Sequence, residues 1–553
     1  MRKGLLFIAI AIAASSSIQA AERVTPLTER IDVSVINVDV VATDRNGKPL
    51  GGLSSDDFEV YEDGQLQPIS NFYVIANAAV QSSPATHVPG RTSPPAAQHF
   101  RRKVVLLIDN NFIEKPPRDA ALKLLDSFID SHFAGGYDWS VTTIGADVRT
   151  LLPFTDDKAR IHEALNRARK TPTLNSHIAL EREILSDPGH RGLREGMDSS
   201  GETFGETMRF KGREQTMRNL MATRKSALAL VEMCRAYSAE EGKKLVVLVT
   251  GGMERNTSFS AYDSDKDRNM RDMKLETEQI LDAMTREANA ANFNIYVINA
   301  KTRGMQALQH DVSNKSAGLT SNGSALYETT GSEAVDVSDV DSSSIKLALG
   351  TGGLYMPGGR IDQSFEKIDT ESSNFYSLGY HSPHPEDGKY HHIRVVLRRG
   401  GVFIRHREGY LDASVDQRIE QTLRAPMSFP REKGTLRVTL EVGRPDPGAP
   451  TLSVPVTVAL PMSSLTVIPR DDQFVGRVHV YLSVYDSAGR NVGYHHQIQN
   501  VALTRQEFAL LAETNFRYKM NVGLKRGDYT VTITLRDDVT NETGTAVKDV
   551  RLF

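Results

Sequence analysis

The sequence offers almost no cysteine. Cys234 is the only one among 553 residues, so the chain can form neither an internal disulfide nor a thiolate metal cluster. This cysteine lies in the apolar helical pattern Leu228–Cys234, which predicts a small buried core residue rather than a reactive thiol.

An excess of charge of either sign is also absent. The chain has 66 Lys and Arg residues against 69 Asp and Glu residues, which gives a net charge of -3 at pH 7. Nucleic-acid-binding proteins usually carry a basic face or a high isoelectric point, so this balance predicts no nucleic-acid partner. Hydrophobic residues make up 39% of the chain, which is ordinary for a globular protein, and the length predicts roughly three to four domains.

Long hydrophobic runs are missing after the N-terminus, and the run at the N-terminus is short. Arg2 and Lys3 precede the apolar stretch Leu5–Ala14, and small residues follow in Ser15–Ala20. This pattern predicts a signal peptide over residues 1–20, and an export to the periplasm or the cell exterior. The apolar stretch is shorter than the ~20 residues of a membrane span, so cleavage is favoured over a retained anchor, which stays the alternative. The mature protein then has no transmembrane segment.

The most informative stretch of the chain is Lys103–Asn111. Five consecutive apolar residues run into Asp109, Asn110 and Asn111. Such a run predicts a strand buried on both faces of a parallel sheet. Ligands of open α/β sheets bind just beyond the carboxyl ends of the strands, so Asp109 and Asn111 are candidate binding residues.

Strands and helices alternate around this central strand. Residues 102–373 therefore predict an α/β domain with a doubly wound, mostly parallel sheet, into which one hairpin places a single antiparallel strand. Residues 171–211 are polar and rich in Gly and Glu, and we interpret them as a loop insertion before a long helix over Glu214–Glu240. The other predicted strands are Trp139–Ile144, Val148–Phe154, Leu245–Val249, Phe293–Ile298 and Leu354–Met356.

The flanking segments are predicted to be β-rich. Residues 28–76 alternate in hydrophobicity and contain Asn46–Gly47, a strong hairpin signal, so they predict a small N-terminal β module. Residues 77–101 form a linker rich in Ala, Ser and Pro. Residues 374–411 predict a β extension that leads to a C-terminal two-sheet sandwich over residues 412–553, with an Ig-like or fibronectin-like architecture.

The order of several motifs resembles a known family. The chain is similar to the von Willebrand factor A domain, and specifically to the A-like proteins abundant in acidobacteria. The similarity covers roughly Ile31–Leu411 and implies a Rossmann-like A-domain fold with β modules before and after it, usually in a binding role. It rests on Asp56–Gly64, Val104–Asp109, Leu245–Gly252, Thr351–Gly353, Asn374–Tyr380, Gly388–Tyr390, Ile393–Val395 and Arg407–Tyr410.

The resemblance also implies a metal-ion-dependent adhesion site, which this sequence keeps only in part. The family pattern is Asp-x-Ser-x-Ser after the first strand, with an Asp after the fourth strand. Asp109 matches the first position and Asn111 stands at the first Ser, where its carbonyl oxygen is a further ligand. Ile113 at the second Ser and Gly251 at the later Asp offer no side-chain oxygen.

A further threonine of the family site has two candidates here, Thr171 and Thr173, beside the predicted insertion. A hard dication such as Mg²⁺ or Ca²⁺ prefers oxygen ligands, so the loss of two of them predicts a degenerate site. Asp109 and Asn111 are its residual metal ligands, and no resident cofactor is expected. The alternative is that Asp109 caps the helix or loop that follows it.

Two other clusters have metal-ligand character. Asp263–Asp267 begins like a calcium loop, but Arg268 and Lys274 stand where that loop needs a Gly and a Glu, which predicts a solvated acidic loop. Several histidines are candidate zinc ligands, although the surrounding Pro and Gly favour an exposed loop, and adjacent histidines on a strand point to opposite faces. These histidines are His381, His384, His391 and His392, with His495 and His496 later in the chain.

Recognisable catalytic motifs are absent from the sequence, including Gly-x-Ser-x-Gly, His-Glu-x-x-His and the phosphate-binding Gly-x-x-x-x-Gly-Lys loop. The sequence therefore predicts a secreted or envelope binding protein that is not an enzyme, with a protein or cell-envelope partner. Two alternatives remain: a metal-dependent adhesion module, and an envelope hydrolase with an unrecognised site. Neither the partner nor the oligomeric state follows from the sequence.

Overall fold

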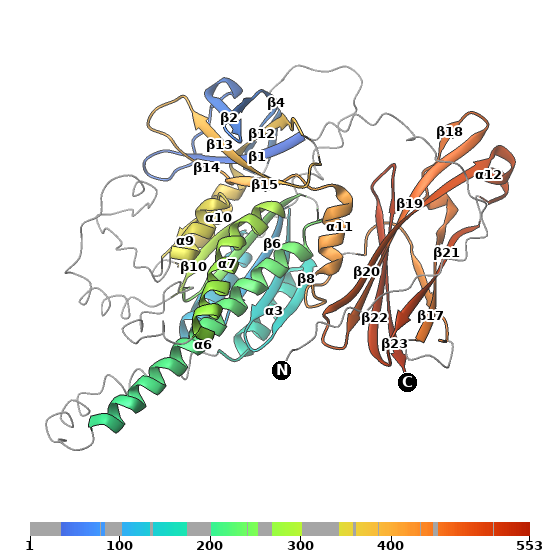
Figure 1. The fold of residues 1–553 in the computed structure, drawn as a ribbon. Helices are drawn as coiled ribbons and strands as arrows, with labels where there is room; N and C mark the ends of the chain where they lie inside the picture. The colour runs from blue at the N-terminus through green and yellow to red at the C-terminus, as the bar shows by residue number, and fades with distance from the viewer. Residues whose placement is uncertain are drawn as a thin grey trace. The chain divides into compact units, whose positions relative to one another are not determined.

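The computed structural model describes most of the chain in two compact units, one ending at Ser414 and one beginning at Val415 (Figure 1). The predicted signal peptide, most of the predicted linker and Asp263–Asp267 lie outside the described residues. The described residues are 35–77, 79–82, 102–132, 136–173, 201–240, 242–252, 268–300, 342–357, 361–384, 386–431, 433–445, 452–511 and 514–553.

A six-stranded sheet forms the centre of the first unit, in the order β11-β10-β9-β6-β7-β8. All neighbours are parallel except β7 and β8, which form the antiparallel hairpin that the sequence predicts. The order reverses between β6 and β9, as in doubly wound sheets. The strands are β6 (Arg102–Asp109), β7 (Tyr137–Ile144), β8 (Val148–Thr155), β9 (Lys243–Thr250), β10 (Phe293–Asn299) and β11 (Tyr355–Met356).

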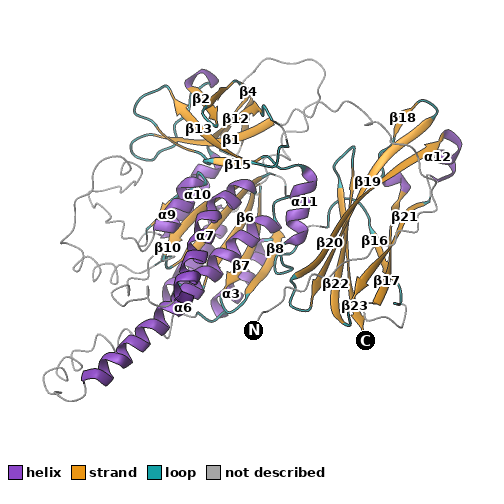
Figure 2. Ribbon diagram, viewed as in Figure 1, coloured by secondary structure: helices purple, strands orange, loops and turns teal. Residues whose placement is uncertain are grey.

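Helices cover both faces of this sheet, which explains why its strands are continuously apolar (Figure 2). Val104, Leu106 and Ile108 of β6 pack in one core with α2, α3 and α10, while the alternate residues of the strand face the other helices. Cys234 is buried on α6, as predicted. The helices are α2 (Lys115–His132), α3 (Lys158–Lys170), α6 (Gly201–Ala236), α7 (Arg268–Ala290), α9 (Ser342–Gly350) and α10 (Ile361–Ser373).

The helix α6 starts earlier than the sequence pattern indicates. The prediction of a loop through Lys211 was wrong over Gly201–Lys211, which is helical. Two glycines weaken this stretch, but an established helix gains one hydrogen bond for each residue added, while nucleating a helix is the costly step. The residues from 174 to 200 lie outside the described part of the chain.

The predicted N-terminal β module and β extension pair into one β module, which we define as β1–β5 with β12–β15. In its larger sheet, β12 lies between β1 and β4, in the order β14-β1-β12-β4-β5. The smaller sheet has the order β15-β13-β2-β3. The strands are β1 (Val35–Thr43), β2 (Phe58–Glu62), β3 (Gln65–Gln67), β4 (Ile69–Ala76), β5 (Ala79–Ser82), β12 (Phe375–His381), β13 (Tyr390–Leu397), β14 (Phe403–Arg405) and β15 (Gly409–Leu411).

Alternating apolar residues of both sheets form the core of the β module, among them Val38, Val60, Phe72, Leu378 and Val395. The Asn46–Gly47 signal marks a real turn, but the chain beyond it makes only a single bridge, between Thr43 and Pro49. The hairpins of the module are instead β2–β3 and β4–β5, and β5 occupies residues that were predicted to belong to the linker. In the β2–β3 turn, Asp63 and Gly64 both have positive φ values, 46° and 84°. A two-residue turn with positive φ at both positions has a backbone twist that matches the twist of the flanking strands.

Buried polar contacts join the β module to the parallel-sheet domain. Arg405 of β14 forms an ion pair with Glu371 of α10 at 2.6 Å, and both side chains are at most 10% exposed. Arg405 also donates a hydrogen bond to the carbonyl of Gly353 at 2.9 Å. Lys243 of β9 pairs with Asp39 of β1 at 3.0 Å.

The second unit contains two antiparallel sheets, β16-β17-β21 and a five-stranded sheet in which β19 pairs with β18, β20 and β22. Their facing side chains, such as Val456, Val522, Leu482 and Ile533, share one core, which gives the predicted two-sheet packing. The elements are α11 (Val415–Arg424), β16 (Thr439–Val442), β17 (Leu452–Pro461), β18 (Ile468–Arg470), β19 (Gln473–Asp486), β20 (Asn491–Thr504), α12 (Arg505–Leu511), β21 (Asn515–Leu524), β22 (Gly527–Asp537) and β23 (Thr543–Leu552).

No helix in the described part of the chain combines the length and the apolar character that a membrane crossing requires.

Replacing Arg405 tests the junction in the first unit. Arg405→Ala leaves Glu371 buried without its partner, which we expect to lower the free energy of unfolding by about 3 to 5 kcal/mol. Arg398→Ala is the matched control, because Arg398 pairs with Glu59 at 2.9 Å but is 61% exposed, and an exposed pair is worth about 1 kcal/mol at most. Denaturant unfolding of both variants, followed by the fluorescence of Trp139, measures the difference; equal losses would contradict this role of the junction.

Candidate functional site

The candidate site at the carboxyl end of β6 is a buried network of polar side chains. Asp109 is fully buried, and its Oδ1 accepts hydrogen bonds from the backbone N–H of Asn111 at 3.1 Å and from the hydroxyl of Ser226 at 2.9 Å. The amide Nδ2 of Asn111 donates to Ser226 Oγ at 2.9 Å. The structure therefore brings both predicted residues together and adds Ser226, which the sequence analysis missed because it lies more than 100 residues away on α6.

Burial controls the charge of Asp109. Desolvation raises the pKa of this carboxyl to about 7, against hydrogen bonds from Ser226, Asn111 and Thr250 that favour the charged form. The second oxygen, Oδ2, is buried and completes no hydrogen bond as an acceptor within the described residues. A carboxyl with a pKa of about 7 is largely protonated below neutral pH, so this site does not need a cation to balance a buried charge.

The residues around Asp109 do not fit a metal-ion-dependent adhesion site, in which the dication is exposed to a partner. Ile113 is 1% exposed and packs in the core of the domain, where it offers no ligand. A Cβ at Gly251 would lie 1.8 Å from the carbonyl oxygen of Phe112, so no carboxylate can occupy this position without moving the backbone. Asp109 and Thr250 are both 0% exposed, so the described part of the chain leaves neither side chain open to a partner's carboxylate.

The candidate threonine of the metal pattern has a structural role. Thr171 ends α3, and its hydroxyl donates to the carbonyl of Arg167 at 3.3 Å. Its own carbonyl accepts from the buried guanidinium of Arg118, which also donates to Asn110 Oδ1 at 2.9 Å. Arg118 therefore ties the end of β6 to the end of α3. The assignment of Asp109 and Asn111 as residual metal ligands stays a prediction.

The pKa of Asp109 predicts a pH-dependent stability. The folded-state pKa of about 7 lies above the unfolded value of 3.8, so the folded state holds this proton more tightly. The free energy of unfolding should therefore fall by up to ~1.4 kcal/mol per pH unit between about pH 4 and pH 7, and then level off. Asp109→Asn keeps an acceptor oxygen but has no carboxyl to titrate, so this loss of stability between pH 4 and pH 7 should disappear.

We expect the stability gap between Asp109→Asn and the unmodified protein to widen in favour of the variant, by about 4 kcal/mol from pH 4 to pH 7. Denaturant unfolding at several pH values, read from Trp139, measures this gap. Asp130→Asn, at an exposed carboxyl, is the control and should show no such widening. A gap that is the same at every pH would mean that Asp109 does not titrate as burial requires.

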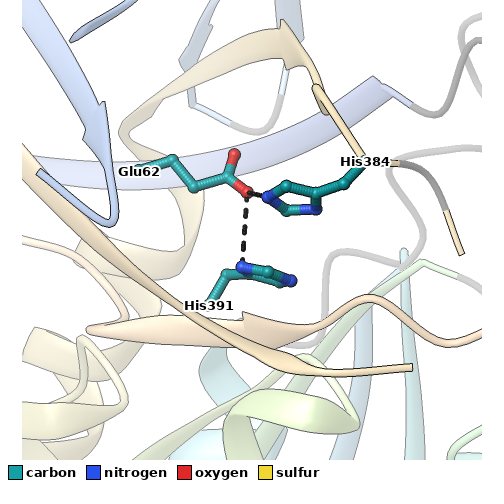
Figure 3. A group of neighbouring side chains, drawn as sticks. All are labelled: Glu62, His384 and His391. Carbon is teal, nitrogen blue, oxygen red and sulfur yellow. Dashed lines mark ion pairs between the residues drawn. The ribbon is translucent and has the colours of Figure 1, made fainter. Parts of the chain in front are cut away.

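A second candidate site lies at one end of the smaller sheet of the β module. The hairpin β2–β3 supplies Glu62, the strand β13 supplies His391, and the β12–β13 loop supplies His384 (Figure 3). Glu62 Oε1 lies 3.1 Å from His384 Nε2 and 3.8 Å from His391 Nδ1. Of the four clustered histidines, the structure thus brings His384 and His391 together, while His381 and His392 are exposed.

Further carboxylates hold the outer sides of these two imidazoles. His391 Nε2 is 3.1 Å from Asp387 Oδ1, and His391 Nδ1 is 2.7 Å from Asp63 Oδ2. His384 Nδ1 is 3.7 Å from Asp412 Oδ2. Burial alone would lower the pKa of His391, but the hydrogen bonds to Asp63 and Asp387 raise it overall. The hydrogen bond with His391 and that from the backbone N–H of Lys389 lower the pKa of Asp387 to about 2.

A third cluster, in the second unit, has similar residue types but a different charge balance. Asp416, His479 and His496 lie close together, but the guanidinium of Arg536 is among them. Arg536 Nη2 is 2.6 Å from Asp416 Oδ1 and 3.0 Å from His479 Nδ1. Hydrogen bonds from His479 and Tyr481, together with the charge of Arg536, lower the pKa of Asp416 despite burial. An arginine thus already neutralises this acid.

Comparisons with known proteins give little direction. No family model matches the chain, and no curated protein matches it. Similar solved structures include an aerotolerance-related membrane protein from Bacteroides fragilis, 12% identical with a TM-score of 0.26, over 49% of this chain and 98% of that one. A domain of a biofilm-associated protein is 9% identical with a TM-score of 0.13, over 32% of this chain and 43% of that one.

The type V pili tip protein Mfa5 from Porphyromonas gingivalis is also similar, at 9% identity and a TM-score of 0.17, over 95% of this chain and 78% of that one. Scores this low carry no argument about fold or activity.

Proposed function

We propose that this chain is an exported binding protein, not an enzyme, in which a von Willebrand factor A-like domain engages a protein or cell-envelope partner without a metal ion. The A-like assignment is supported by the sheet order β11-β10-β9-β6-β7-β8 with its single antiparallel edge strand. The family motifs of the sequence, from Val104–Asp109 to Arg407–Tyr410, support the same assignment.

One observation carries the metal-independent part of this proposal. The carbonyl of Phe112 fills the space beside Gly251, where the family pattern has a metal-binding carboxylate. Metal-dependent adhesion requires an ion that a partner's carboxylate can reach, whereas Asp109 is wholly inside the protein. The metal-dependent reading and the hydrolase reading have no comparable observation in their favour.

A partner surface is still available at the same edge of the sheet. The N-terminus of α2, directly after the β6–α2 loop, exposes Lys115, and the β7–β8 turn exposes Ala146 and Asp147. Loops at the carboxyl ends of parallel strands are the usual binding region of such sheets, because a rigid scaffold holds them in place. We propose that these two loops contact the partner directly, through polar groups of the protein.

Calorimetric titration with Mg²⁺ and Ca²⁺ tests the metal independence. The protein starting at Ala21 is first treated with a chelator, and Asp109→Ala is titrated in parallel. We expect no saturable heat that depends on Asp109, and the same melting temperature with and without either ion. Saturable binding that disappears in Asp109→Ala would restore the metal-dependent adhesion reading.

Partner binding tests the proposed surface. A partner isolated from the envelope fraction of the source cells should bind equally in Mg²⁺ and in chelator. The substitutions Lys115→Glu and Asp147→Arg at the carboxyl edge should weaken this binding by about 1 to 3 kcal/mol, if they lie in the contact. The matched controls Lys123→Glu and Glu163→Arg, exposed on α2 and α3, should leave it unchanged. Equal effects of edge and control variants would contradict the assigned surface.

A further inference from the structure

The buried acids of the β module lack a fixed positive charge. Glu62 and Asp412 are each 2% exposed or less, and their ion-pair partners among the described residues are histidines, without a Lys or Arg. Burying a carboxylate without a paired cation is expensive, so such a group normally has an arginine, a lysine or a metal ion beside it. Asp63 and Asp387 add two more acids around the same pair of imidazoles.

The two oxygens of the Glu62 carboxylate have different surroundings, and Oε1 is the one that faces the two imidazoles (Figure 3). Glu62 Oε1 accepts a hydrogen bond from Tyr410 Oη at 2.9 Å, whereas Oε2 is buried and has no hydrogen-bond partner within the described residues. The hydroxyl of Tyr380 interacts with the same carboxylate. The donors around Glu62 are thus hydroxyl groups, and neither an arginine nor a lysine forms an ion pair with it among the described residues.

We propose that Glu62, His384 and His391 form a site for a divalent transition-metal ion of the zinc class. Two imidazoles and one carboxylate suit zinc better than calcium or magnesium, which prefer oxygen ligands throughout. Two ligand atoms on a tetrahedral zinc ion lie about 3.3 to 3.6 Å apart. The distances from Glu62 Oε1 to the two ring nitrogens, 3.1 and 3.8 Å, bracket this spacing, and all three ligand atoms lie within 4.8 Å of one another.

The surrounding carboxylates have the places that outer partners of metal-bound histidines take. Such a histidine usually gives its second ring N–H to a carboxylate, which fixes the orientation of the ring. Asp387 faces the second nitrogen of His391, Nε2, and Asp412 faces that of His384. The proposed ligand atom of His391, Nδ1, also lies 2.7 Å from Asp63 Oδ2, so an ion bound there replaces this hydrogen bond. The rings of His384 and His391 are stacked with centroids 3.8 Å apart, so His384 must rotate before its Nε2 and the Nδ1 of His391 can face one ion. His384 is 33% exposed and lies in the loop between β12 and β13.

The ion connects segments that are far apart in the sequence. Glu62 comes from the strand before the parallel-sheet domain, and both histidines come from the chain that follows it. Metal binding should therefore stabilise the β module, because a ligand that binds only the folded state shifts the unfolding equilibrium. Three protein ligands leave the fourth coordination position of a tetrahedral ion open to water or to a ligand atom of a partner.

The test is titration of the chelator-treated, full-length mature protein with Zn²⁺, followed by calorimetry and by melting temperature. We expect one saturable zinc site, a rise in melting temperature, and the visible absorption bands of tetrahedral Co²⁺ when cobalt replaces zinc. His384→Ala should weaken zinc binding by more than about 100-fold, because even the loss of an outer partner, as in Asp387→Asn, costs roughly 10- to 100-fold. Glu62→Gln should have an effect similar to that of His384→Ala.

Two controls make the assignment specific. His392→Ala removes an exposed histidine on the opposite face of β13, and His496→Ala removes one from the cluster that Arg536 neutralises. Both should keep zinc binding and the cobalt spectrum unchanged. His384 is partly exposed, so its variant should fold, which far-ultraviolet circular dichroism verifies. Absence of saturable zinc binding, binding that survives in His384→Ala, or binding that is lost in His496→Ala would each overturn the proposal.

Discussion

The position of β12 between β1 and β4 is the constraint on which the rest of the first unit depends. Its backbone pairs with β1 on one side and with β4 on the other, so the chain returns to a sheet that it began about 300 residues earlier. The parallel-sheet domain is thus inserted between two halves of one β module. The entropic cost of closing a loop grows only slowly with the length of the loop. The apolar core of the module compensates for this cost. This return also places Glu62 beside His384 and His391.

Three acids have three different surroundings in this protein. Desolvation dominates at Asp109, which gains a pKa of about 7 and can hold a proton. At the partly exposed Asp416, the guanidinium of Arg536 supplies the opposite charge at 2.6 Å. The buried Glu62 has no arginine as an ion-pair partner among the described residues, but has two imidazoles that metal ions bind well. The contrast between the second and third cases is why only one of two similar His–Asp/Glu clusters supports a metal assignment.

The sequence predicts the parallel-sheet domain well because each of its strands carries a strong local signal. Val104–Ile108 is apolar at every position, as burial on both faces demands. The turn residues between β7 and β8 can also be recognised in the sequence. In the second unit, the strand β20, which pairs with β19, is hard to recognise from the sequence because its polar residues, such as His495, His496 and Gln497, hide the alternation. The start of α6 at Gly201 was missed because glycine and polar residues resemble a loop when helix propagation is ignored.

The candidate sites show the same limit more sharply. Asp109 and Asn111 were found because they are adjacent to a recognisable strand, while Ser226 was not, since nothing local links it to β6. The histidines could be recognised in the sequence because they are close together along the chain. Glu62, the carboxylate that completes the proposed ligand set, lies over 300 positions away and is brought beside His384 by the pairing of β2 with β13. The exposure of His392 and the burial of His391 follow from strand alternation, which local reasoning did supply.

The two proposals are physically connected by what each site can offer to a second molecule. At the carboxyl edge of the parallel sheet, the Phe112 carbonyl and the buried Asp109 leave no accessible ion, so recognition there depends on loop side chains. In the β module, by contrast, the acids surround a partly exposed imidazole, and an ion there keeps a fourth coordination position. In the two proposals together, the protein binds no metal ion at the end of β6 and binds one in the β module, where the ion stabilises the folded state whether or not a partner is bound.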